Sequence, residues 1–199
     1  MERFAGEALD PAAIREALGP GSGLDAVEVL EEVASTNDLA AERARAGAPP
    51  WRAVLAEAQS GGRGRRGRVW DSPPGKNLYL SLTLPPFDDT AALGPLPLAL
   101  GVSLVEALRD RVPGVRLKWP NDLVSQAGAK LGGVMLEVEP ASRQVVLGLG
   151  VNVNAAPPGD PADRHGLPRT SLAALVRAEL DRNALAPQVL RALLAGWTE

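Results

Sequence analysis

The sequence predicts an α+β protein with a mixed, largely antiparallel central sheet that is flanked by helices. Two observations support this fold class. Strand patterns follow one another in the centre of the chain, whereas helical patterns are grouped between and after them. Residues 77–84 (NLYLSLTL) also alternate strictly between leucine and other residues, which is typical of a strand with one buried face. A doubly wound parallel sheet would instead alternate strands with helices.

Local signals then predict each element in order. Asp10 as N-cap, Pro11 at the first helical position and Gly19 as a stop predict a short helix. Residues 26–33 predict a strand, and Ser35 or Thr36 then caps a helix that ends at Gly47. The remaining predictions are strands over 52–59, 77–84, 115–119, 130–139 and 145–153, a helix over about 93–112, a helix over 171–180 capped by Thr170, and a helix that starts at Pro187.

Composition excludes several kinds of chemistry. The chain has 199 residues, a net charge of −3 and no cysteine, which excludes disulfides, thiolate catalysis and zinc–thiolate sites. Its one histidine, His165, excludes a site built from several histidines. Neither a signal peptide nor a membrane span is visible, so we expect a soluble cytoplasmic protein. Because only three of the 21 basic residues are lysines, a lysine is more informative than an arginine here.

Residues 60–70 (SGGRGRRGRVW) match the pattern G-x-G-x-x-G of dinucleotide-binding folds. The match lacks its structural context, because a turn and a strand follow it where that fold needs a helix. The catalytic-loop motifs of protein kinases are missing as well. Backbone N–H groups between glycines can still surround an anion, and arginine forks bind phosphate or carboxylate. This segment alone supports a small-anion site and a nucleic-acid contact equally well.

Three further segments favour a small-molecule site. Residues 118–123 (KWPNDL) bring a lysine, an amide and a carboxylate together, although a plain Asx turn explains the same letters. Lys130 stands before two glycines, where a ligand or another backbone can approach closely. Residues 146–154 place Gly148, Gly150 and Asn152 on one strand face, which leaves room for a flat ligand or for tight packing.

Taken in order, STN (35–37), AQSGGRGRRGRVW (58–70), KWPNDL (118–123), KLGG (130–133) and GLGVNVN (148–154) resemble the catalytic domain of biotin–protein ligases. The resemblance implies the class II synthetase-like fold of the biotin–lipoate ligases. It also implies a two-step reaction: biotin and ATP form biotinyl-5′-AMP and pyrophosphate, and a lysine of a biotin carboxyl carrier domain then attacks the adenylate. The Gly/Arg segment would close over the adenylate and exclude water.

The resemblance assigns roles to positions of this sequence. The residues expected to bind biotin are Ser35, Thr36, Asn37, Gln59, Gly62, Arg63, Gly64, Arg65, Lys130, Gly132, Gly148 and Gly150. Those expected to bind ATP are Arg65, Arg66, Trp70, Lys118, Asn121 and Asn152. The catalytic residues would be Lys130, Arg65 and Asp122, with Asp122 also holding Mg²⁺.

The resemblance also sets expectations for domains and partners. Residues 1–24 would form a helical lead-in and residues 25–199 the catalytic domain, without the C-terminal β-barrel that family members usually carry. Residues 1–24 are too few for a winged-helix domain, so we expect no DNA binding. A homodimer is compatible with the family. The alternatives are a lipoate or octanoyl transferase of the same superfamily and a non-catalytic module that binds adenylate or nucleic acid.

Overall fold

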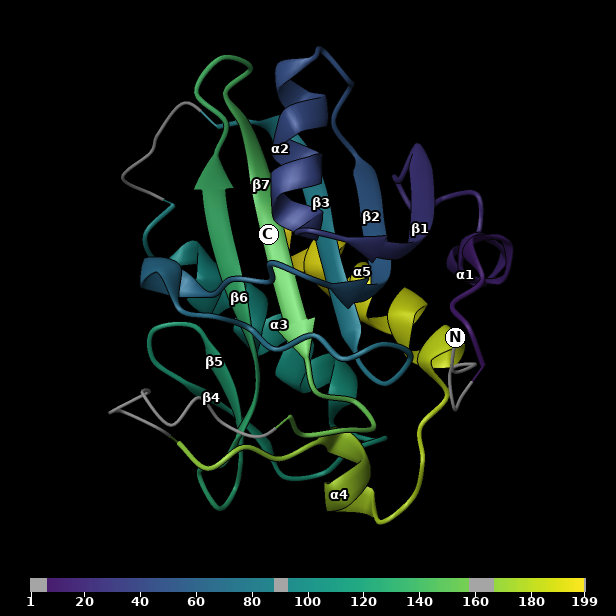
Figure 1. Cartoon of the computed structure of the whole chain (residues 1–199), viewed down its shortest axis with the longest axis vertical. Helices are drawn as coiled ribbons and strands as arrows, with labels where there is room; N and C mark the ends of the chain where they lie inside the picture. Colours follow the sequence, from purple (N-terminus) through teal and green to yellow (C-terminus); the bar gives the residue numbers. More distant parts are fainter. Residues whose placement is uncertain (1–6, 88–92, 158–166, 199) are drawn as a thin grey trace.

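The computed structural model describes residues 7–87, 93–157 and 167–198, and Figure 1 shows the arrangement of its elements. His165 lies outside the described residues. The strands are β1 (Ala26–Val33), β2 (Arg52–Gln59), β3 (Leu78–Pro86), β4 (Val115–Lys118), β5 (Asp122–Ser125), β6 (Lys130–Val138) and β7 (Gln144–Val151). The helices are α1 (Pro11–Leu18), α2 (Thr36–Arg45), α3 (Leu96–Leu108), α4 (Leu172–Val176) and α5 (Arg182–Thr198), with a short 3₁₀ turn, η1 (Arg65–Gly67).

Within the described ranges, all seven strands join one sheet in the order β1-β2-β3-β7-β6-β5-β4. Only β1 and β2 run parallel, and every other neighbouring pair is antiparallel. The predicted mixed, largely antiparallel sheet is therefore confirmed. β7 lies between β3 and β6 and is hydrogen-bonded on both edges, which places the glycine-containing strand at the centre of the sheet.

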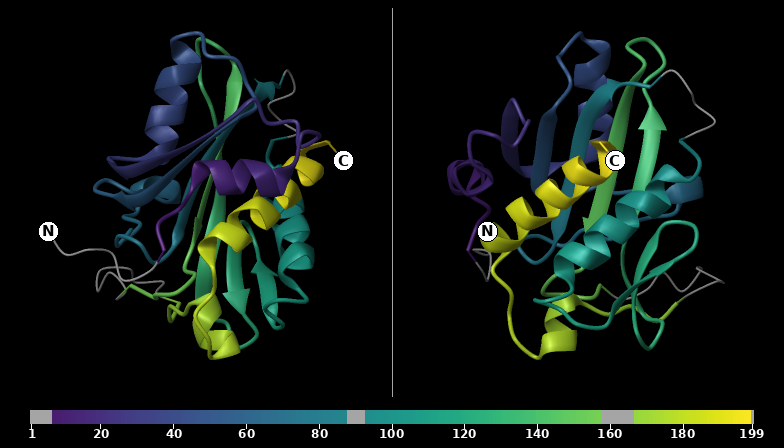
Figure 2. Two further views of the ribbon diagram at one scale, coloured as in Figure 1. Left: turned by 90° about the vertical axis from the view of Figure 1, so that its right-hand side faces the viewer. Right: turned by 180° about the vertical axis from the view of Figure 1, so that it is seen from behind.

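One face of the sheet forms the hydrophobic core. Leu78, Leu80, Leu82 and Leu84 of β3 are all fully buried, as their alternation predicts. α3 and α5 lie across this face, and α1 packs beside α5 (Figure 2). Leu9, Ile14 and Leu18 belong to the same cluster of buried residues, so the N-terminal helix is part of the common core.

The opposite face carries α2 (Figure 1). α2 contacts β3, β7 and β2, so its first turn stands directly above the middle of the sheet. Its start agrees with the prediction, because the Ser35 side chain accepts a hydrogen bond from the backbone nitrogen of Asp38. None of the helices in the described ranges has the length and apolar content that crossing a bilayer requires.

The structure corrects three local predictions. β5 was missed, because four residues after a proline and an asparagine resemble a turn and reveal themselves only by pairing with β4 and β6. Ser171 rather than Thr170 caps α4, and its side chain accepts from the nitrogen of Ala174. α5 begins before Pro187: the carboxylate of Asp181 accepts from the nitrogens of Asn183 and Ala184 and acts as the cap.

Candidate active site

A cavity of about 340 Å³ lies on the sheet face that carries α2. Its walls come from the first turn of α2, from residues 118–122, from strands β6 and β7, and from residues 60–70, called the arginine loop below. Segments that are distant in the sequence therefore meet at one place. A strand edge, a helix start and a loop can together present backbone groups and side chains to one ligand.

Most of the residues expected to bind substrates line this cavity. They are Ser35, Thr36, Asn37, Gln59, Arg63, Gly64, Arg65, Arg66, Trp70, Lys118, Asn121, Asp122, Lys130, Gly148 and Gly150. Gly62, Gly132 and Asn152 are not among the lining residues. A Cβ on Gly62 or Gly132 would lie 2.5 Å from a backbone oxygen, so these glycines serve close packing. Asn152 is buried and donates its side-chain amide to the Thr170 carbonyl.

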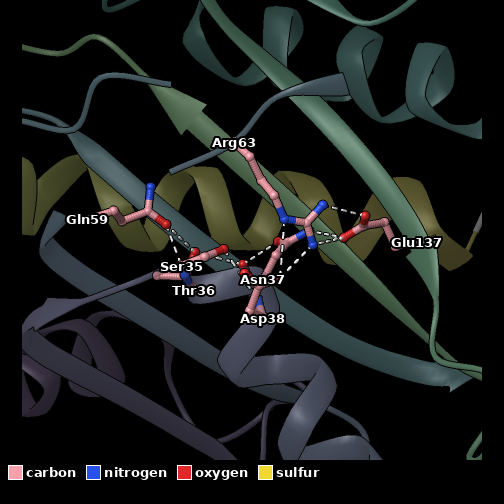
Figure 3. A network of polar contacts seen from close by, with 8 residues as sticks. Ser35, Thr36, Asn37, Asp38, Gln59, Arg63 and Glu137 are labelled. Atoms are coloured by element: carbon pink, nitrogen blue, oxygen red, sulfur yellow. Dashed lines mark hydrogen bonds and ion pairs between the residues drawn. The ribbon is translucent and has the colours of Figure 1, made fainter. Parts of the chain in front are cut away.

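One end of the cavity is polar and mostly neutral. The Gln59 carbonyl oxygen accepts from the backbone nitrogen of Thr36 at 2.9 Å and from its hydroxyl at 3.2 Å. The Ser81 hydroxyl lies 2.8 Å from the Thr36 hydroxyl oxygen and 2.6 Å from the Asn37 amide oxygen. Figure 3 shows Thr36, Asn37 and Gln59 above the sheet. Hydroxyls and amides held in this way can read a neutral ligand that both donates and accepts hydrogen bonds.

The other end of the cavity is cationic. The Lys130 ammonium lies 2.9 Å from an Asp122 carboxylate oxygen and 5.5 Å from the centre of the Trp70 ring. Arg65 donates to the Asn121 amide oxygen at 3.3 Å. Arg66, Lys118 and Arg169 add further positive charge to the lining. Cationic groups beside a partly enclosed space favour carboxylate and phosphate ligands.

Lys130 is fixed by its backbone as well as by its side chain. Its nitrogen donates to the Pro168 carbonyl at 2.6 Å, and its carbonyl accepts from the Thr170 nitrogen at 2.9 Å. Residues 168–170 therefore extend the sheet beside the start of β6. This pairing also brings Arg169 to the cavity, where its guanidinium lies 2.9 Å from Asp71.

The glycine face of β7 was correctly predicted, but side chains of this chain already cover part of it. A Cβ built on Gly148 would lie 2.2 Å from the amide oxygen of Asn37, and one built on Gly150 would lie 2.6 Å from the indole nitrogen of Trp70. Of the two alternatives left open by the sequence, close packing is the one the structure shows at these two positions. The glycines let Asn37 and Trp70 sit low against the sheet as cavity walls.

The arginine loop is folded against the sheet. Gly64 donates to the Arg68 carbonyl at 2.7 Å and Trp70 to the Gly62 carbonyl at 2.9 Å. The Arg63 guanidinium contacts the carboxylates of both Asp38 and Glu137. These hydrogen bonds, that to Glu137 first, raise the pKa of Arg63 further above its ordinary value. Arg63 is therefore permanently charged, and two anions of the protein already compensate it.

The residues present fit Mg²⁺ only in part. Among the described residues that line the cavity, Asp122 is the single carboxylate, and one of its oxygens is paired with Lys130. In the described part of the chain, no three acidic, histidine or cysteine side chains gather as a metal site. Mg²⁺ commonly uses one or two carboxylates together with substrate phosphates. Asp122 suits that arrangement, whereas a site made of protein ligands alone does not exist among these residues.

Several residues of the site were missed in the sequence, and four of them have polar contacts there: Ser81, Asp38, Glu137 and Arg169. Ser81 had a usable signal, because it stands on the polar face of the alternating strand. Asp38 follows the STN segment directly, and Glu137 lies on the same strand face as Gly133 and Met135. Neither position in the sequence indicates that the side chain pairs with Arg63. Arg169 comes from a distant loop and reaches the site only through tertiary pairing.

The fold is shared with solved biotin protein ligases. The Aquifex aeolicus enzyme in complex with biotin and ATP superposes with a TM-score of 0.73, at 31% identity, over 88% of this chain and 71% of that one. The Leishmania major enzyme in complex with biotinyl-5-AMP gives a TM-score of 0.66, at 29% identity, over 84% of this chain and 73% of that one. The cavity thus occurs on a fold known from enzymes that were solved with these ligands.

Sequence comparison agrees with the structural comparison. The biotin/lipoate A/B protein ligase family matches residues 29–154, and the chain belongs to this family. The biotin–[acetyl-CoA-carboxylase] ligase of Mycobacterium tuberculosis is 39% identical over 194 residues, which are 94% of this chain and 70% of that protein. The Escherichia coli bifunctional ligase/repressor BirA is 39% identical over 147 residues. The chain matches only 44% of the BirA length.

Proposed function

We propose that this protein is a biotin–[acetyl-CoA-carboxylase] ligase: it activates biotin with ATP as biotinyl-5′-AMP and transfers biotin to a lysine of a carrier domain. The observation that carries the proposal is the polarity of the cavity. One end offers neutral hydroxyls and amides, and the other offers Lys130 and the arginines. Biotin is itself divided in this way, into a neutral ureido ring and a carboxylate.

The polar end suits the ureido ring. Thr36, Asn37 and Gln59 together present hydroxyl and amide groups that can both donate and accept. Thr36 and Asn37 are almost fully buried, so a ring bound there would exchange water for fixed partners. The covered face of β7 and the Trp70 ring provide flat walls for an apolar ligand body.

The cationic end suits the chemical steps. In the first step a biotin carboxylate oxygen attacks the α-phosphorus of ATP, and the bond to the bridging oxygen breaks as pyrophosphate leaves. Negative charge is concentrated around the α-phosphate as this occurs. Lys130 is placed to balance that charge from a fixed position, which is the arrangement that lowers a barrier most effectively. In the second step the amine of the carrier lysine attacks the biotinyl carbonyl, and AMP leaves with the bond electrons.

Asn121 and Asp122 would contact the nucleotide phosphates. Asp122 would also hold Mg²⁺ together with those phosphates. Mg²⁺ would neutralise phosphate charge when bound. Trp70 and Lys118 would lie on the adenine and phosphate side of the cavity. Neither step needs a covalent enzyme intermediate, in agreement with a chain that contains no cysteine.

Two alternatives remain as competing proposals. A lipoate or octanoyl transferase fits the family description, which names both ligase types. The Mycobacterium tuberculosis relative, however, is named a biotin–[acetyl-CoA-carboxylase] ligase. The hydroxyl and amide groups at the neutral end of the cavity would also find no hydrogen-bonding partner in an aliphatic chain. A module that binds nucleic acid would use the arginine loop, yet Arg63 is already compensated by two carboxylates. A homodimer, the lack of DNA binding and a cytoplasmic location stay predictions.

Biotin-dependent exchange of labelled pyrophosphate into ATP tests the activation step. We expect exchange with biotin and Mg·ATP, and none with lipoate or octanoate in place of biotin. Transfer is tested separately, by incorporation of labelled biotin into a purified carrier domain of acetyl-CoA carboxylase. Exchange with lipoate alone would support the transferase, and salt-sensitive RNA binding without any exchange would support the nucleic-acid module.

A further inference from the structure

Glu137 stands behind the polar end of the cavity. It lies on β6 and is outside the cavity lining, with its side chain 37% exposed. Its carboxylate accepts from the Asn37 amide nitrogen at 2.9 Å and from Arg63 at 2.7 and 3.1 Å (Figure 3). One carboxylate therefore touches both the first turn of α2 and the arginine loop.

The contact with Glu137 determines which way the Asn37 amide faces. An ionised carboxylate only accepts hydrogen bonds, so the NH₂ group of Asn37 must point toward it. The amide oxygen then points toward Ser81, whose hydroxyl donates to it at 2.6 Å. Asn37 is 4% exposed and Ser81 is fully buried, so water offers neither of them a substitute. Burial makes such an oriented set of hydrogen bonds stronger than the same bonds in water.

The orientation extends along the floor of the cavity. The Ser81 hydroxyl group lies between the Asn37 amide oxygen and the Thr36 hydroxyl, and it has one hydrogen to donate. Thr36 in turn contacts the Gln59 carbonyl oxygen through both its nitrogen and its hydroxyl. With Asn37 reversed, its amide oxygen would face the Glu137 carboxylate, and neither group has a hydrogen to donate to the other.

Glu137 and Asp38 share the second role, which is to anchor Arg63. The Arg63 guanidinium donates to Asp38 through Nε and one terminal nitrogen, and to Glu137 through both terminal nitrogens. Asp38 contacts the loop but not the Asn37 amide, and its side chain is 55% exposed. Both carboxylates contact Arg63, and of the two only Glu137 also holds the Asn37 amide.

We propose that Glu137 is a positioning residue for biotin recognition: its carboxylate sets the orientation of the Asn37 amide and, with Asp38, anchors the arginine loop before the substrate binds. This inference rests on the proposed function and adds a residue that does not touch the substrate. Its consequence is specific, because loss of Glu137 should weaken recognition of biotin far more than that of ATP.

The test compares Glu137→Gln with Asp38→Asn in the pyrophosphate exchange assay, with biotin and ATP varied in turn. A glutamine amide offers both a donor and an acceptor, so it no longer dictates the orientation of Asn37. We expect Glu137→Gln to raise KM for biotin about tenfold or more, as for a lost hydrogen bond to a charged group. We expect Asp38→Asn, which weakens the anchoring of the loop but keeps the contact between Glu137 and Asn37, to raise that value less than Glu137→Gln does. In both variants KM for ATP should change less than KM for biotin.

A double-mutant cycle with Asn37→Ala checks that Glu137 acts through Asn37. In the Asn37→Ala background, Glu137→Gln should add little further loss of biotin binding, measured by calorimetry without ATP. Equal urea midpoints show that the variants are folded. Wild-type exchange with an unchanged biotin KM in Glu137→Gln overturns this inference alone. Equal effects of Glu137→Gln and Asp38→Asn overturn the role through Asn37. Absence of biotin-dependent exchange in the wild type overturns the proposed function and this inference with it.

Discussion

At the scale of single residues, two glycines of β7 decide the shape of the cavity. The missing side chain at Gly148 is the space into which the Asn37 amide fits, and the one at Gly150 is filled by the Trp70 ring. Asn37 cannot move away freely, because Ser81 and Glu137 hold both ends of its amide. Because β7 has no side chain at these two positions, the side chains of Asn37 and Trp70 can lie directly against the strand.

Gly148→Ala should therefore damage biotin binding. The new methyl group would lie 2.2 Å from the Asn37 amide oxygen and would force this buried side chain out of place. We expect a loss of stability of about 1–3 kcal/mol, as for overpacking of a core, together with a raised KM for biotin. Gly21→Ala is the control, because a Cβ there meets no atom within 4 Å. Urea unfolding measures the loss of stability, and pyrophosphate exchange measures KM for biotin. An unchanged biotin KM in Gly148→Ala would contradict the proposal that Asn37 forms part of the biotin site.

Lys130 is the residue whose charge matters most for the proposed chemistry. Lys130→Ala should slow biotin-dependent pyrophosphate exchange by about 10²-fold or more, the scale of losing one fixed group that stabilises a transition state. Lys76→Ala removes the same charge from a lysine that lies outside the cavity lining and 3.8 Å from Glu179. That control should retain exchange within about twofold. Equal losses in both variants would mean that net charge, not position, explains the effect.

At the scale of elements, a buried ion pair joins the start of α5 to strand β2. Arg182 at the start of α5 lies 2.6 Å from Glu57 of β2, and their side chains are 3% and 4% exposed. The same pair binds the N-terminal segment, since Glu57 accepts from the Leu9 nitrogen and Arg182 donates to the Glu7 carbonyl. β2 continues from Glu57 to Gln59 and the arginine loop, so this pair supports the strand that leads into the site.

Arg182→Met should destabilise the protein by about 3–5 kcal/mol, because it leaves the Glu57 carboxylate buried without its partner. Adding Glu57→Leu should recover part of that loss, since two apolar side chains can replace a buried pair. The pair of Lys76 and Glu179, whose side chains are 33% and 66% exposed, is the comparison, and its removal should cost no more than about 1 kcal/mol. Urea denaturation measures all three changes. A double variant less stable than Arg182→Met alone would contradict this account.

At the scale of the whole molecule, two glutamates make folding sensitive to acid. Hydrogen bonds from the Arg43 side chain lower the pKa of Glu28, and a hydrogen bond from the Ser142 backbone nitrogen is the largest of several that lower the pKa of Glu139. A carboxyl group with a lowered pKa in the folded state contributes stability above its ordinary value near 4.5, and that contribution is lost as the pH falls through the folded value.

The urea midpoint of the wild type should therefore fall as the pH is lowered below about 4.5. A variant with both Glu28→Gln and Glu139→Gln should be less stable at neutral pH. It should also lose less of its stability between about pH 5 and pH 3, roughly the range in which paired carboxylates take up a proton. Glu16→Gln, an exposed glutamate of α1, serves as the control and should follow the wild-type curve. Parallel curves for the wild type and the double variant would exclude these two groups as the cause.

The sequence by itself determined the fold class and most of the polar residues that line the cavity. Alternating leucines in β3, Ser35 as a cap and Asp10 before Pro11 are local signals, and each corresponds to what the structure contains. The sequence segments that resemble the family motifs all contribute residues to the lining of one cavity. Local patterns suffice here because side-chain periodicity and capping depend only on near neighbours in the chain.

Only the tertiary structure decided which groups meet. Glu137 lies 100 positions from Asn37 and 74 positions from Arg63 in the chain, and it contacts both. β5 exists through its pairing with β4 and β6, and Arg169 enters the site through its bridge to Lys130. From the sequence, Gly148 and Gly150 of β7 could leave space for a ligand, whereas in the structure Asn37 and Trp70 pack against them. Packing brings these groups together across long stretches of chain, and no local pattern records the partner that fills a given space.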